Sequence, residues 1–186
     1  MSRPLTGLLT GPVGAGKTTV AERVAGLVHE RGLTCGGLLA PSLKDSSGTK
    51  IGIWGVDLHS GERRVLARID RAMDGPHIGI YSFDATTLSW AIGAIERAMG
   101  SCDLLIVDEI GKLELWGNAG LAPLVPRLAL GTVTRSLVIV REALLAELQT
   151  RLGPVKQAVF EVGRDNRDQL PPQIVARLFS DGKFDN

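Results

Sequence analysis

Residues 11–18 have the types and spacing of a loop that binds phosphate groups. They match the pattern G-x-x-x-x-G-K-[ST] at every fixed position. Glycines let the backbone curl until its amides point at an anion, and a helix expected to begin near Lys17 adds the positive end of its dipole. The residues predicted to bind the nucleotide here are Gly11, Pro12, Val13, Gly14, Ala15, Gly16, Lys17, Thr18 and Thr19. The expected ligand is a nucleoside triphosphate, ATP or GTP.

Two side chains of this loop are expected to act on the triphosphate. Lys17 is a point charge that would reach the β and γ phosphates, and the Thr18 hydroxyl is a ligand for Mg²⁺. Magnesium is the only metal that the sequence implies, because its two cysteines and three histidines share no ligand spacing.

An acidic pair after an apolar run would supply the second half of such a site. Residues 104–107 read LLIV and are followed by Asp108 and Glu109. A parallel strand that ends in an acidic residue delivers its carboxylate to the sheet edge where phosphates bind. Asp108 is predicted to hold Mg²⁺, and Glu109 to activate the attacking water as a general base. The pair therefore predicts hydrolysis rather than binding alone.

Charge that develops on a transferred phosphoryl group is often met by an arginine. Arg141 is the first candidate because it follows the strand predicted over residues 136–140, and Arg164 and Arg167 are the others. Asn166 and Arg167 could alternatively contact the base, since they lie where several folds with this loop place the base pocket.

The elements that must position these residues alternate between strands and helices. Short apolar runs predict strands over 5–10, 36–40, 50–57, 63–66, 104–108, 136–140 and 158–161. Helical spacing of apolar residues predicts helices within 17–28, 84–99, 121–130, 144–148 and 171–178, with Asp84 as a cap and the Pro171–Pro172 pair in a first turn. Short connections favour antiparallel pairing of the strands between 36 and 66.

The predicted fold is a three-layer α/β P-loop NTPase fold. Its sheet is mostly parallel, with a small antiparallel meander inserted after the first strand-helix unit. Residues 1–180 are expected to form one domain of this type, and residues 181–186 a frayed tail.

Composition narrows the classes of function. The chain has 186 residues with 21 basic and 20 acidic side chains, so it lacks the overall positive charge of a nucleic-acid binder. No apolar run is long enough to span a bilayer and no export signal precedes the first strand, which favours a cytoplasmic protein without membrane contact. Cys35 and Cys102 are expected to be reduced, buried thiols.

Residues 107–115 read VDEIGKLEL, and this string resembles the signature of the THEP1-type nucleoside-triphosphatases, small P-loop proteins that hydrolyse nucleoside triphosphates. Further matches are Val56-Asp57-Leu58, Ser60-Gly61-Glu62-Arg63-Arg64, the G-x-Y element at Gly79 and Tyr81, and the N-R-x-x-L-P pattern from Asn166 to Pro171. The resemblance covers nearly the full chain in the right order. It implies a nucleoside-triphosphatase.

The sequence departs from that family's pattern away from the loop and the acidic pair. The family usually has an aromatic residue, two acidic residues and an arginine where this chain has Leu38, Pro41, Ser42 and Lys44, and a basic residue where it has Ile80. These differences bear on nucleotide preference and rate, whereas hydrolysis remains chemically available.

Two other functions share the same motifs. A nucleotide or small-metabolite kinase would pass the phosphoryl group to a bound acceptor instead of water. A nucleotide-dependent switch would use slow hydrolysis to regulate a partner protein. The sequence leaves the physiological substrate, a protein partner and homo-oligomerisation open.

Overall fold

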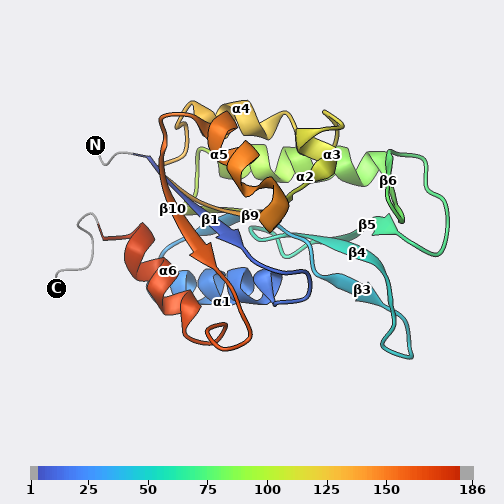
Figure 1. Cartoon of the computed structure of the whole chain (residues 1–186), viewed down its shortest axis with the longest axis horizontal. Coiled ribbons are helices and arrows are strands. Elements are labelled where there is room, and N and C mark those ends of the chain that lie inside the picture. Colours follow the sequence, from blue (N-terminus) through green and yellow to red (C-terminus); the bar gives the residue numbers. More distant parts are fainter. Residues whose placement is uncertain (1–3, 181–186) are drawn as a thin grey trace.

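The structure is a computed structural model that describes residues 4–180, so the predicted tail at 181–186 lies outside the described residues. It is built on one ten-stranded sheet with helices on both faces (Figure 1). The strands are β1 (Leu5–Thr10), β2 (Cys35–Leu39), β3 (Ser42–Lys44), β4 (Lys50–Asp57), β5 (Arg63–Arg68), β6 (His77–Ile78), β7 (Tyr81–Phe83), β8 (Leu104–Ile110), β9 (Arg135–Val140) and β10 (Lys156–Glu161). The helices are α1 (Lys17–Glu30), α2 (Ala85–Ala98), α3 (Lys112–Leu115), α4 (Leu124–Ala129), α5 (Leu145–Leu152) and α6 (Leu170–Leu178), and a 3-10 helix, Glu142–Leu144, precedes α5.

The strand order is β10-β1-β9-β8-β2-β4-β5-β7-β6, with β3 beside β4. The first five strands in this order are parallel, and the others form an antiparallel extension. Strand β2 is the junction, because it pairs in parallel with β8 and in antiparallel with β4. The predicted α/β class with an inserted meander is confirmed. The meander is larger than predicted, because it also contains β3, β6 and β7. The sequence did not predict these strands, since each is only two or three residues long and has no clear apolar pattern.

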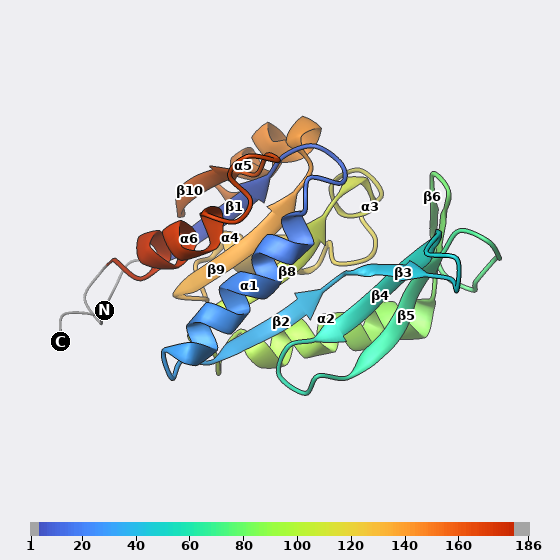
Figure 2. The same ribbon diagram turned by 90° about the horizontal axis from the view of Figure 1, so that it is seen from below.

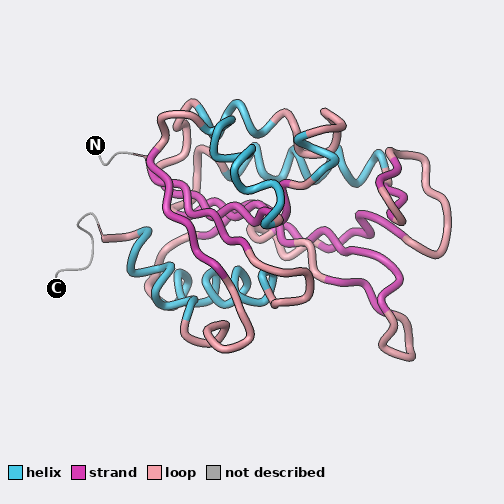
Figure 3. Tube along the Cα trace, in the orientation of Figure 1, coloured by secondary structure: helices cyan, strands magenta, loops and turns pink. Residues whose placement is uncertain are grey.

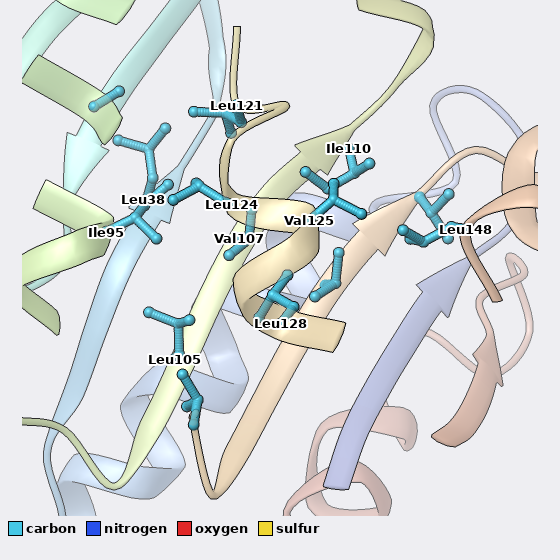
Figure 4. Packing of buried hydrophobic residues seen from close by; sticks show 14 of the residues in the cluster. Leu38, Ile95, Leu105, Val107, Ile110, Leu121, Leu124, Val125, Leu128 and Leu148 are labelled. Carbon is cyan, nitrogen blue, oxygen red and sulfur yellow. The ribbon is translucent and has the colours of Figure 1, made fainter. Parts of the chain in front are cut away.

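Helices α1 and α6 cover one face of the parallel strands, and α2, α4 and α5 cover the other (Figures 1 and 2). The tube view shows the resulting helix-sheet-helix layers (Figure 3). Side chains alternate along each central strand, so Leu8 and Val107 belong to the α2 side while Leu9 and Ile106 belong to the α1 side. On the α2 side, Leu124 packs with residues of β8 and α2 (Figure 4). Burial of both faces explains why the parallel strands are continuous apolar runs.

Local signals account for the points where α2 and α4 begin. The Asp84 carboxylate accepts a hydrogen bond from the Thr87 amide at 2.6 Å, which confirms the predicted cap of α2. The helix predicted over residues 121–130 is shorter, because α4 begins after Pro123 and carries Pro126 in its first turn, where proline is tolerated.

The remaining global expectations concern the membrane and the thiols. Between residues 4 and 180, no helix combines the length and the apolar character needed to cross a bilayer. Cys35 and Cys102 are free, as predicted; Cys35 is buried, and burial raises its pKa to about 12, whereas Cys102 is only half-buried. Neither thiol is activated by its surroundings.

The close approach of β2 to β8 gives a first testable prediction. Gly37 has a φ of +105°, and a Cβ there would lie 2.0 Å from the Ile106 carbonyl oxygen. We expect Gly37→Ala to lower the free energy of unfolding by at least about 2 kcal/mol, because both backbone strain and a clash with main chain arise. Urea denaturation measures the change. The matched control is Gly26→Ala in α1, where a Cβ meets nothing within 4 Å and should stabilise the helix by about 0.5–1 kcal/mol. Equal effects of the two substitutions would contradict the prediction.

Candidate active site

The glycine loop lies between β1 and α1, where the motif predicted it. Gly11 and Gly16 have φ values of +136° and +99°, a region that side chains rarely adopt. A Cβ at Gly11 would lie 2.3 Å from the Val162 carbonyl oxygen, and one at Gly16 would lie 2.7 Å from Cδ of Arg167. The loop is therefore seated against the segment that follows β10. The contact with main chain requires glycine at position 11, and the positive φ favours glycine at both positions.

Lys17 begins α1 and is 9% exposed. Its ammonium donates hydrogen bonds to the carbonyl oxygens of Gly11 at 2.8 Å and Pro12 at 2.9 Å. Burial lowers its pKa, and the Arg141 charge adds to that effect, while the carboxylates of Glu109 and Asp108 oppose it. The lysine is thus held at the loop and within electrostatic reach of the residues at the ends of β8 and β9.

Asp108 is the buried carboxylate of the site, with 3% of its surface exposed. Its Oδ2 accepts a hydrogen bond from the Ala40 amide at 3.0 Å, and the Thr18 side chain also hydrogen-bonds to it. Burial raises the pKa of Asp108 to about 6, although both hydrogen bonds favour the charged form. A carboxylate beside a hydroxyl is a pair of hard oxygen donors, which fits Mg²⁺. The sequence predicted both residues for this role.

Glu109 and Arg141 contact each other directly. Arg141 donates from Nε to Oε1 of Glu109 at 2.6 Å, and both side chains are partly exposed. Burial lowers the pKa of Arg141, but the charge and hydrogen bond of Glu109, together with Tyr81 and Glu114, raise it, and the pKa lies above its ordinary value. The contact arises because β8 and β9 are neighbouring parallel strands. The sequence suggested each residue separately and gave no sign of the pair.

The C-terminal candidates lie beside the loop but differ in their contacts. The Asn166 side chain accepts from the Gly163 amide at 2.8 Å and donates to the Glu161 carbonyl at 2.9 Å, so it closes the turn after β10. Arg167 packs its Cδ against Gly16, and Arg164 is exposed. Pro12, Val13 and Gly14 are exposed on the loop, and Thr19 is exposed on α1.

Two residues near the site received no role from sequence reasoning. Glu114 is 6% exposed, and its carboxylate accepts hydrogen bonds from the amides of Gly111 and Leu121. Tyr81 is on β7, and the Nζ atom of Lys50 lies over its ring, 5.2 Å from the ring centroid. Tyr81 also contributes to the raised pKa of Arg141. A signal for Glu114 did exist, because a charged residue between Leu113 and Leu115 interrupts an apolar stretch.

The geometry defines a class of protein. A lysine and a hydroxyl from a glycine loop after β1 meet a buried carboxylate near the carboxyl end of β8, a parallel strand separated from β1 by β9, which is the arrangement of P-loop NTPases.

Comparisons with known proteins narrow this class. A family model described as NTPase matches residues 7–175. Nucleoside-triphosphatase THEP1 of Methanopyrus kandleri is 36% identical over 173 residues, which cover 92% of this chain and 93% of the relative. The cancer-related nucleoside-triphosphatase homolog of Bos taurus is 31% identical over 189 residues, with 94% and 97% covered.

Two solved structures have the same fold as this chain. The crystal structure of THEP1 from Aquifex aeolicus has the same fold, with a TM-score of 0.73 at 22% identity over 94% of this chain and 99% of that one. The solution structure of a human cancer-related nucleoside triphosphatase gives 0.72 at 27% identity, covering 98% and 100%. The chain belongs to the THEP1-type nucleoside-triphosphatase family, as the VDEIGKLEL string suggested.

The buried Asp108 carboxylate makes stability depend on pH. Because its pKa rises from 3.8 in the unfolded chain to about 6 in the folded protein, the folded state binds this proton more tightly. The free energy of unfolding is therefore highest at or below about pH 4, where Asp108 is protonated in both states. It falls as the pH rises to about 6, by up to about 3 kcal/mol in total, and Asp108 causes no further change above that pH. We expect Asp108→Asn to be more stable than the wild type at pH 8 and similar to it at pH 4. Urea denaturation of the nucleotide-free, metal-free protein measures this.

The matched control is Asp45→Asn. Hydrogen bonds from Ser47 lower the pKa of this exposed carboxylate, so its removal should give no gain in stability at pH 8. An Asp108→Asn variant that is less stable than the wild type at pH 8 would contradict the assignment.

Proposed function

We propose that the protein is a Mg²⁺-dependent nucleoside-triphosphatase that hydrolyses a nucleoside triphosphate to the diphosphate and phosphate, with Glu109 activating the water. The observation that carries the proposal is the contact between Glu109 and Arg141, located within electrostatic reach of Lys17 and next to Asp108 in the chain. It brings together a candidate base, an arginine for phosphoryl charge and the phosphate loop. Family membership supports the reaction type.

Binding of the substrate would use the loop and the start of α1. The backbone amides of the loop, other than at Pro12, which has no N–H, would surround the phosphates, and the dipole of the 14-residue helix α1 would favour their negative charge. Lys17 would turn from the carbonyls of Gly11 and Pro12 toward the β and γ phosphates. Thr18 and Asp108 would hold Mg²⁺, which when bound neutralises charge on the phosphate oxygens.

The ion pair between Glu109 and Arg141 determines which of their atoms are available for hydrolysis. The ion pair uses Oε1 of Glu109 and Nε of Arg141, so Oε2 is left to accept a proton from water. As the water oxygen bonds to the γ phosphorus, the bond from that phosphorus to the bridging oxygen breaks and the diphosphate leaves. The Nη groups of Arg141 would donate to the transferred phosphoryl oxygens, where they stabilise the charge that develops. The pair thus orients both groups in advance.

The base side of the nucleotide would lie toward the turn after β10. Arg167 rests on Gly16 at the start of α1, which places its guanidinium beside the loop. Asn166 would act mainly by keeping that turn closed, because both ends of its amide are bonded to main chain. A guanidinium such as that of Arg167 can lie against any base and does not select one, so we expect the protein to accept both ATP and GTP.

A panel of nucleotides tests the reaction type. Pure protein is incubated with ATP, GTP, CTP or UTP and Mg²⁺, and free phosphate is measured over time, with EDTA as the metal control. We expect phosphate release without an acceptor and loss of release in EDTA. Phosphate that reaches only an added acceptor would show a kinase, and release that requires a partner protein would favour a switch.

Two substitutions test the roles of the ion pair. Glu109→Gln should lower kcat by about 10²–10⁴-fold while nucleotide affinity is retained, because a general base is lost and the binding loop is not. Arg141→Gln should lower kcat by about 10³-fold through loss of transition-state stabilisation. Glu22→Gln and Arg177→Gln are the exposed matched controls on helices α1 and α6, and both should retain wild-type turnover within about threefold. Full activity in Glu109→Gln would refute the assigned base.

A further inference from the structure

Glu114 is a buried carboxylate that hydrolysis, as described above, does not use. It lies on the single-turn helix α3 and is 6% exposed. Oε2 accepts a hydrogen bond from the Gly111 amide at 2.8 Å, and Oε1 accepts one from the Leu121 amide at 3.2 Å. Burying a carboxylate is costly, and here burial raises its pKa. The carboxylate ties the two ends of the segment 111–121 together.

The two hydrogen bonds of Glu114 close residues 111–121 into a ring, here called the Glu114 ring. At Gly111 this ring lies next to Glu109, the candidate base. A Cβ at Gly111 would lie 3.4 Å from Oε1 of Glu109 and 3.5 Å from Oε2 of Glu114, so both carboxylates flank the same α-carbon. At the other end of the ring, a Cβ at Gly120 would lie 2.6 Å from Oε1 of Glu114. The position of Gly111, two residues after Glu109, is therefore fixed from the side of Glu114.

The same segment is also attached to the helix that follows Arg141. Arg151 of α5 donates to the Leu115 carbonyl oxygen, and the Trp116 indole donates to Glu147 of α5 at 2.7 Å. Because α5 follows Arg141 through one 3-10 turn, the segment after the base and the helix after the arginine form one unit. Within this unit, the hydrogen bond from the Gly111 amide to Glu114 fixes the part of the chain that lies next to Glu109.

We infer that Glu114 is a positioning residue for Glu109: its two hydrogen bonds fix Gly111 and thereby set the carboxylate of Glu109 against Arg141 and the attacking water. The inference rests on the proposed role of Glu109 as the base. Loss of the ring leaves residues 11–18 untouched, so the effect falls on the chemical step and not on nucleotide binding.

The test combines steady-state kinetics with a double substitution. Glu114→Gln keeps the shape and one acceptor and should lower kcat about tenfold, and Glu114→Ala should lower it about a hundredfold, with KM and ADP affinity unchanged. In the Glu109→Gln background, Glu114→Gln should cause no further loss, because it acts through the missing base. Ile95→Val in α2 is the control for reduced stability alone, and its kcat should stay within about twofold of the wild type.

Hydrogen exchange gives a readout that does not depend on activity. In the nucleotide-free protein, the amides of Gly111 and Leu121 should exchange faster in Glu114→Gln and Glu114→Ala than in the wild type or Ile95→Val. Unchanged kcat in Glu114→Gln, an additive loss in the double variant, or unchanged exchange at Gly111 would each overturn the inference. Full activity of Glu109→Gln would overturn the proposed function itself, whereas an inactive Glu109→Gln with a fully active Glu114→Gln overturns the inference alone.

Discussion

The burial of the Asp108 carboxylate is the constraint on which the rest of the site depends. A carboxylate with 3% exposure is tolerated only where hydrogen bonds replace its water, and here they come from the Ala40 amide and the Thr18 side chain. These donors belong to the segment after β2 and to the first turn of α1. One side chain therefore fixes three parts of the chain relative to each other, and its pKa of about 6 records that burial still outweighs the hydrogen bonds.

The strand order extends this constraint to the rest of the site. The central order β1-β9-β8-β2 places in a row the chain segments that lead to Lys17, Arg141, Asp108 and Ala40. All four strands are parallel, so their carboxyl ends meet at one edge even though the residues are far apart in sequence. The ion pair between Glu109 and Arg141 follows from the adjacency of β8 and β9. The helices that cover both faces keep the strands in that order.

The parts that sequence reasoning predicted are those with a local signal. The phosphate loop, the acidic strand end and the Asp84 cap each depend on neighbours in sequence. The Glu109–Arg141 contact depends instead on the insertion of β9 between β1 and β8, and no periodicity reveals strand order. The function of the Asn166 amide in closing a turn was missed for a different reason: its partners, at Gly163 and Glu161, are close in sequence but are main-chain atoms, which no residue type identifies. Strands β3, β6 and β7 were missed because they are too short for an alternating pattern.

The departures from the family pattern lie mostly outside this rigid row. Ser42 and Lys44 are exposed on β3, and Ile80, 69% exposed, lies in the turn between β6 and β7. Pro41 contributes its carbonyl oxygen to the Trp54 amide, which is a main-chain contact that does not depend on its side chain. The neighbouring anchor of Asp108 is likewise the main-chain amide of Ala40. Because that anchor needs no particular side chain, the antiparallel extension can vary while Asp108, and with it the phosphate edge of the sheet, stays in place.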